Sequence, residues 1–219
     1  MRASSRVILE VSLVFIAVIG VCKTLDRFRS VPWVERYDIV ALGAACLFLY
    51  VPLAVLHTMR RRPQDFGITF QGIGTSLRMT VAFSVLFLPP FFLAYSLYHA
   101  VWFHSAPHLR VSPDLPLLFV YHLLCVALPE EVFYRGYVQS RLNMAFPGRI
   151  RIFSAYVGFG WIYTALLFAF GHFLITHRLE RWATFLPGLL FGWLRERTGS
   201  ILAPTLFHAL CNAAVLLMA

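Results

Sequence analysis

The segment PEEVFYRGY, residues 129–137, places two adjacent glutamates and an arginine at the end of a long apolar run. Burying a charged side chain is costly unless the charge is paired or used, so these residues need an explanation. Glu131 and Arg135 are four residues apart and would share one face of a helix, where they could form an ion pair. Glu130 would point about 100° away around the same helix. The pattern suggests one carboxylate held by an arginine beside a second that is free for other chemistry.

Two further apolar runs carry the other polar candidates. His172 lies in FAFGHFL, and His208 and Asn212 lie in LFHALCN. His208 and Asn212 are four residues apart, so they would also share a helix face. Taken together, the runs would offer carboxylates, imidazoles and a carboxamide, groups that exchange protons or donate hydrogen bonds.

Each of these signals also has a purely structural explanation. A Glu–Arg pair near a helix end is often only an interfacial ion pair, and a lone asparagine often holds two membrane helices together. A lone histidine often satisfies a neighbouring polar group. The combination is more informative, because ionisable groups inside membrane helices are rare and usually mark functional sites. His122, about two helical turns before Glu130, could line the same cavity.

Three motifs follow one another along the chain, in the order E-E-x-x-x-R (130–135), F-x-x-x-H (168–172) and H-x-x-x-N (208–212). This pattern resembles the CPBP family of intramembrane proteases, which includes the CAAX prenyl endopeptidases of Rce1 type and the bacteriocin-immunity Abi proteins. The resemblance covers about residues 115–219, and RERTGSILAPTLFHALCN is also similar to the family's last motif region. It implies an intramembrane endopeptidase that hydrolyses a peptide bond of a membrane-associated protein or peptide.

The resemblance also implies roles for the site residues. Glu130 would be the general base that activates a water molecule together with His172. Glu131 and Arg135 would orient the site. The reaction would then need no cofactor.

Asn212, together with His208, would stabilise the tetrahedral oxyanion, and a well-aimed carboxamide can contribute about 3 kcal/mol in such a role. One alternative is a zinc metalloprotease in which Glu130, His172 and His208 hold the metal. The spacing differs from the HExxH of zincins, and Arg135 would neutralise one of the carboxylates that a metal requires. Another alternative is a non-catalytic, Abi-like membrane protein in immunity or sorting, although the intact motif set favours an enzyme.

The elements that must position these residues are membrane helices. Hydrophobic residues make up 59% of the 219-residue chain and charged residues only 13%, values outside the range of soluble proteins. A spanning helix needs about 20 mostly apolar residues. The sequence therefore predicts an all-α, polytopic helical membrane bundle of about seven transmembrane helices. The expected spans are Val7–Cys22, Ile39–Met59, Met79–Trp102, Leu115–Tyr134, Ile152–Phe173, Trp182–Leu194 and Ile201–Met218.

The predicted boundaries leave two questions. The sixth span is short and contains Pro187 and Gly188, so it could be tilted, broken or re-entrant if it packs inside protein. His172 would also lie at the far end of its span from Glu130 if that helix began at Ile152. The residues can meet only if the fourth helix continues beyond Tyr134 or if the fifth begins with an interfacial segment. The stretch RLNMAFPGRIRI, residues 141–152, could supply either.

No internal repeat or linker divides the chain, so residues 1–219 are predicted to form a single integral-membrane protease domain, with its motif core at about 115–219. The net charge of +9 does not indicate a nucleic-acid partner, because the basic residues lie in short groups between apolar runs. The expected partners are the lipid bilayer and a membrane protein or peptide substrate. A chain with little beyond the core resembles a bacterial member, which implies the inner (plasma) membrane and the processing of a C-terminal anchor, sorting signal or leader.

Overall fold

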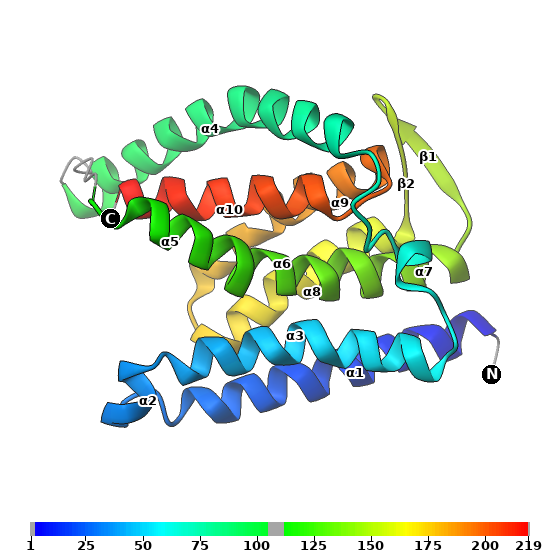
Figure 1. Ribbon diagram of the computed structural model, residues 1–219. Helices are drawn as coiled ribbons and strands as arrows, with labels where there is room; N and C mark the ends of the chain where they lie inside the picture. The colour runs from blue at the N-terminus through cyan, green and yellow to red at the C-terminus, as the bar shows by residue number, and fades with distance from the viewer. Residues whose placement is uncertain (1–2, 105–111, 219) are drawn as a thin grey trace.

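The computed structural model describes residues 3–104 and 112–218, which form a helical bundle with a small β-hairpin at one end (Figure 1). The first half of the chain contains α1 (Ala3–Asp26), α2 (Pro32–Arg36), α3 (Ile39–Thr58), the 3₁₀ helix η1 (Pro63–Phe66) and α4 (Ile73–Phe103). A long continuous helix follows, made of α5 (Leu115–Tyr121), η2 (His122–Ala127), α6 (Leu128–Glu131), η3 (Val132–Gln139) and α7 (Ser140–Ala145). The remainder comprises β1 (Arg149–Ile152), β2 (Ala155–Gly158), α8 (Phe159–Thr176), the 3₁₀ helix η4 (Leu179–Thr184), α9 (Phe185–Thr198) and α10 (Leu202–Leu217).

Five helical stretches in the described part of the chain are long and apolar enough to cross a membrane. They are Ser4–Asp26, Ile39–Thr58, Ile73–Val101, Leu115–Ala145 and Phe159–Thr176. The chain is therefore an integral membrane protein built as a helical bundle. The predicted number of seven spans is not confirmed, because α9 has 14 residues and α10 has 16, fewer than the roughly 20 that a spanning helix needs.

The fourth span continues to Ala145, well beyond its predicted end at Tyr134. Its last turns carry Arg135, Gln139 and Asn143, which are buried against other helices instead of facing lipid. The span predicted from hydropathy ended too early. A hydropathy scale counts these side chains as polar and takes no account of the protein that surrounds them.

The same helix widens into π-helical geometry on both sides of the glutamates, over His122–Ala127 and Val132–Gln139. Pro129, between these segments, has no N–H and cannot make the usual bond to the preceding turn. π-Helical turns in otherwise regular helices are frequent at functional sites. They decide which way Glu130 and Glu131 point.

The predicted fifth span was wrong at its start, because Ile152 lies in the hairpin and α8 begins at Phe159. β1 pairs with β2 in antiparallel register, with Ile150 opposite Val157. Ala155 and Val157 are buried while Tyr156 between them is exposed, which is the alternation of a strand. The all-α prediction therefore fails in this segment. The long fourth helix and the hairpin both contribute to bringing the motifs together, the two routes that the sequence left open.

Aromatic packing joins the helices around the motifs. The ring centroids of Phe133 and Phe48 are 5.2 Å apart and link the fourth span to α3. The ring centroid of Phe83 in α4 lies 5.2 Å from that of Trp193 and 5.7 Å from that of Phe207. In Figure 1, α1 and α3 lie side by side on one side of the fourth span, and α4 arches over α10 on the other. The fourth span thus lies inside the bundle.

The chain between α3 and α4 crosses the hairpin end of the bundle and is tied down there. The backbone N–H of Ile201 donates to the Gly67 carbonyl at 2.9 Å, and the Ser200 hydroxyl donates to the Thr69 carbonyl at 2.7 Å. The Ser140 hydroxyl donates to the Phe66 carbonyl at 3.3 Å. These bonds connect the first half of the chain to both the fourth span and α10.

Gly160, at the start of α8, lies at a close approach between α8 and the fourth span. A Cβ atom at this position would lie 2.7 Å from the backbone oxygen of Gln139 and 2.6 Å from Asn143 Oδ1. We predict that Gly160→Ala lowers stability by about 1–3 kcal/mol through overpacking, measured as a lower midpoint of thermal unfolding in detergent. Gly20→Ala is the matched control, because a Cβ atom on this exposed position of α1 meets nothing within 4 Å. Its midpoint should stay equal or rise, and equal losses in both variants would refute this packing.

Candidate active site

The candidate site is centred on an ion pair buried completely inside the bundle. Arg135 Nη1 lies 2.9 Å from Glu131 Oε1, and both side chains are 0% exposed. The pairing expected from their spacing is therefore present. Arg135 Nη2 donates to the carbonyl of Gly188 in α9 at 3.1 Å. The guanidinium carbon lies 4.5 Å from the ring centroid of Phe168, so an aromatic ring also covers the charge.

Glu131 also holds His208, which α10 brings to the same oxygen. His208 Nδ1 lies 3.0 Å from Glu131 Oε1. A carboxylate can only accept, so His208 Nδ1 carries the hydrogen, and Nε2 of the neutral ring keeps its lone pair. The His208 ring stacks on Phe191 of α9, with centroids 4.7 Å apart and planes inclined by 16°. Glu131 and Phe191 together fix the direction of His208 Nε2.

Glu130 lies on the other side of His208. Its Oε2 is 3.9 Å from His208 Nε2, too far for a direct hydrogen bond but close enough for one water molecule to contact both. Glu130 Oε2 and Glu131 Oε2 are both buried and have no hydrogen-bond partner among the described residues. Buried polar atoms normally have a partner. The geometry therefore provides polar acceptors that a bound water could satisfy.

His172 approaches from α8 and is oriented by its own helix. Its Nδ1 lies 2.9 Å from the Phe168 carbonyl, which can only accept, so Nδ1 carries the hydrogen and Nε2 is left as an acceptor. The Phe168 ring lies 4.5 Å from the His172 ring and 6.0 Å from the His208 ring. The part of the chain that the structure describes shows no hydrogen bond between His172 and Glu130. Phe168 thus links His172 to His208, the imidazole that lies beside Glu130.

Asn212 is the least constrained of the predicted residues. It lies one turn beyond His208 on α10, is half-buried, and has no hydrogen-bond partner within the described ranges. His122 lies on η2, which packs against α10, the helix that carries His208. His122 Nδ1 is buried and also unpartnered among the described residues. His122 therefore lies at the edge of the same cluster.

Sequence reasoning missed the residues that shape the site without polar side chains. Phe168 stands in the F-x-x-x-H motif but was not named, although its ring contacts Arg135 and both imidazoles. Gly188 supplies the carbonyl for Arg135, and the signal for it was the small-residue spacing GLLFG in α9. Phe191 gave no signal of its own.

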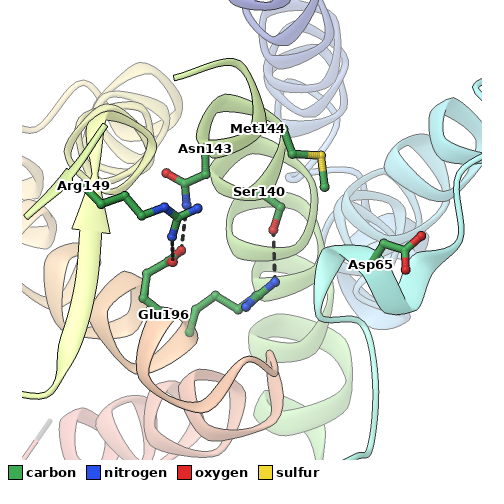
Figure 2. A pocket seen from close by; sticks show the side chains of 7 residues that line it. Asp65, Ser140, Asn143, Met144, Arg149 and Glu196 are labelled. Atoms are coloured by element: carbon green, nitrogen blue, oxygen red, sulfur yellow. Dashed lines mark hydrogen bonds and ion pairs between the residues drawn. The ribbon is translucent and has the colours of Figure 1, made fainter. Parts of the chain in front are cut away.

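A cavity of about 260 Å³ lies elsewhere, at the hairpin end of the bundle (Figure 2). Its lining comes from η1, the fourth span, β1 and α9, and comprises Asp65, Ser140, Asn143, Met144, Arg149, Arg195 and Glu196. None of the motif side chains discussed above lines it. Among residues 3–104 and 112–218, no three His, Cys, Asp or Glu side chains gather in an arrangement that could hold a metal ion.

Comparison with known proteins adds the decisive observation. Residues 112–214 match the family model described as Type II CAAX prenyl endopeptidase Rce1-like. This segment, nearly half of the chain, is therefore similar to that protease family. The matched segment contains all three motifs, and the expected resemblance is confirmed. The family match indicates a peptide hydrolase, and the apolar helices indicate that it is embedded in a membrane, which argues against the non-catalytic alternative. No curated protein and no solved structure matches the chain.

Removing Arg135 from this protease should leave the Glu131 carboxylate buried without its counter-charge. We predict that Arg135→Ala lowers stability by about 3–5 kcal/mol, seen as a large fall in the thermal unfolding midpoint in detergent. Arg141→Ala is the matched control on the same helix, because Arg141 pairs with Glu10 at 2.8 Å with both side chains more than 20% exposed. Its loss should cost no more than about 1 kcal/mol. A similar midpoint for the two variants would contradict the importance assigned to the buried pair.

Proposed function

We propose that the protein is a metal-independent intramembrane endopeptidase in which Glu130 and His172 activate the attacking water. One observation carries the proposal. Buried, unpartnered Glu130 Oε2 faces His208 Nε2 at 3.9 Å, inside the segment that matches the protease family. This arrangement supports a water molecule held by Glu130 beside His208, and the role of His172 is proposed from the family motif. Glu130 is 16% exposed while Glu131 is 0% exposed, so Glu130 is the carboxylate that a substrate or water can reach.

The proposed reaction begins when Glu130 removes a proton from water as the oxygen attacks the peptide carbonyl carbon. His172 would accept a hydrogen bond from the same water through Nε2, because its Nδ1–H is used by the Phe168 carbonyl. The new C–O bond forms as the carbonyl π electrons move to oxygen. Collapse of the tetrahedral intermediate breaks the C–N bond, and the proton taken by Glu130 passes to the leaving amine.

The oxyanion would be stabilised by Asn212 and His208. Asn212 has no partner among the described residues, so its carboxamide N–H groups are available to a substrate. His208, held at Nδ1 by Glu131, would present Nε2 to the oxyanion. Arg135 keeps the Glu131 carboxylate in place for this role.

The substrate we propose is a membrane-associated protein or peptide cut at a C-terminal anchor, sorting signal or leader, with the bacterial inner membrane as the setting. The family description refers to CAAX prenyl endopeptidases, and the site lies within the apolar helices, which favours a substrate that enters from the membrane. Labelling of new N-termini in membranes that contain either wild-type protein or Glu130→Gln would identify the cleaved protein. The same set of termini in both membranes would contradict the proposal.

The general-base assignment predicts a specific pattern of rate losses. Glu130→Gln retains size and shape but cannot take a proton, so turnover should fall by about 10²- to 10⁴-fold while substrate still binds. His172→Ala should fall similarly, because both residues act on one water. The double variant should be about as slow as either single variant, since residues that act as a unit are not additive. Glu180→Gln, on exposed η4, serves as the control and should keep wild-type turnover. Independent, multiplying losses would show that the two residues do not share a water.

The zinc alternative has one observation in its favour, because Glu130 and His208 present two possible ligand atoms to the same space. His172 Nε2 would be the third ligand, and the metal would polarise the water or the peptide carbonyl. We predict instead that purified, active protein carries no stoichiometric zinc and keeps its turnover in the presence of a chelator. Elemental analysis of the active preparation tests this. About one zinc per chain, with activity returning only when zinc is restored, would overturn the metal-independent mechanism.

A further inference from the structure

We propose that Gln139 is a positioning residue for the reaction, because it fixes α9 against the fourth span and thereby holds Arg135 and Glu131 in register with His208. The proposal rests on the function proposed above. It assigns a role to a buried residue outside the three motifs. Gln139 is 0% exposed, and both N–H groups of its carboxamide are used.

The fourth span and α9 are joined by a ladder of three side-chain hydrogen bonds. Each rung joins residues that are 53 positions apart, and successive rungs are four residues apart on both helices, so the two helices run in the same direction. The rungs are Arg135 Nη2 to the Gly188 carbonyl at 3.1 Å, Gln139 Nε2 to the Gly192 carbonyl at 3.0 Å, and Asn143 Nδ2 to Glu196 Oε1 at 2.7 Å.

Gly192 allows the helices to come this close. A Cβ atom at Gly192 would lie 2.7 Å from Gln139 Oε1 and 2.7 Å from Trp161 Cδ1. At Gly188, one turn earlier, a Cβ atom would meet α8 instead, 3.4 Å from Phe168 Cδ1. Small residues spaced by four allow such close approach between membrane helices.

The Gln139 side chain binds both a backbone carbonyl and a side chain of α9. Besides the Gly192 carbonyl, Gln139 Nε2 donates to Glu196 Oε1 at 2.7 Å. Glu196 Oε2 accepts from Arg149 Nη1 of β1 at 2.6 Å, and Figure 2 shows Asn143 and Arg149 converging on this carboxylate. Gln139 and Asn143 therefore share the Glu196 carboxylate, which Arg149 connects to the hairpin.

The top rung belongs to the active site. Gly188, one turn before Gly192 on α9, accepts from the Arg135 guanidinium, whose other nitrogen holds Glu131 Oε1. That oxygen in turn holds His208 Nδ1. α9 has only 14 residues and is not a candidate span, so its depth depends on these lateral bonds. A shift of α9 would move the Gly188 carbonyl and, through Arg135, the imidazole that faces Glu130.

The first test replaces the carboxamide with an apolar side chain of similar size. Gln139→Leu should lower kcat by about 10- to 100-fold with KM within about twofold, since small misplacements of reacting groups have large effects on rate. Tyr137→Phe is the matched control, because it removes one partly buried hydrogen bond from the same helix, made to Glu10 on the α1 side at 3.0 Å. The control should lose stability but keep kcat. Wild-type kcat for Gln139→Leu, measured per folded protein, would overturn the proposal.

A second variant gives a readout that loss of packing would not produce. In Gln139→Glu, the introduced carboxyl group can donate one hydrogen bond to Glu196 when protonated, and repels Glu196 when ionised. Arg149 faces the same carboxylate, and Arg195 and Asp65 line the adjoining cavity. We expect kcat of this variant, relative to wild type, to fall as pH rises, at temperatures where both proteins stay folded. A pH profile parallel to that of wild type would refute positioning by Gln139. Activity retained by Glu130→Gln would refute only the general-base assignment, so the two failures are distinguishable.

Discussion

The organisation of the bundle depends on one buried charge pair, Arg135 with Glu131. In an interior that excludes water, neither charge is tolerable alone, and further hydrogen bonds to both members help to stabilise the pair. Arg135 uses its second nitrogen on the Gly188 carbonyl, and Glu131 accepts from His208. The hydrogen bonds of this one ion pair thus connect α9 and α10 to the fourth span. The same few atoms therefore join three helices at the candidate site.

The sequence was most informative where charge interrupts hydrophobicity. The spacing of Glu131 and Arg135 correctly predicted their contact, and the order of the motifs pointed to the protease family that the comparison confirms. These predictions succeed because pairing at i and i+4 is a local property of a helix, independent of what surrounds it. The catalytic roles of Glu130, His172 and Asn212 stay predictions.

Boundaries and apolar contacts were harder to predict, because both depend on distant partners. The fourth span was predicted to end at Tyr134, because Arg135, Gln139 and Asn143 are polar on a hydropathy scale. In the structure, α9 and neighbouring elements bury all three side chains. The hairpin was hidden because its strands are only four residues long and follow directly into the apolar helix α8. Phe191 stacks on His208 only because α9 and α10 meet there, which no local pattern reveals.

The π-helical turns around the glutamates have a consequence for how this site tolerates change in length. Each residue advances a helix by about 100°, so adding or removing a single residue in Val132–Gln139 would rotate the glutamates by that angle relative to α7. A change between Glu131 and Arg135 would also end their i, i+4 spacing, and a change after Arg135 would turn both residues of the pair relative to α7. Insertions and deletions are usually absorbed in loops. In this helix, the number of residues, and not only their types, determines which side chains face one another at the candidate site.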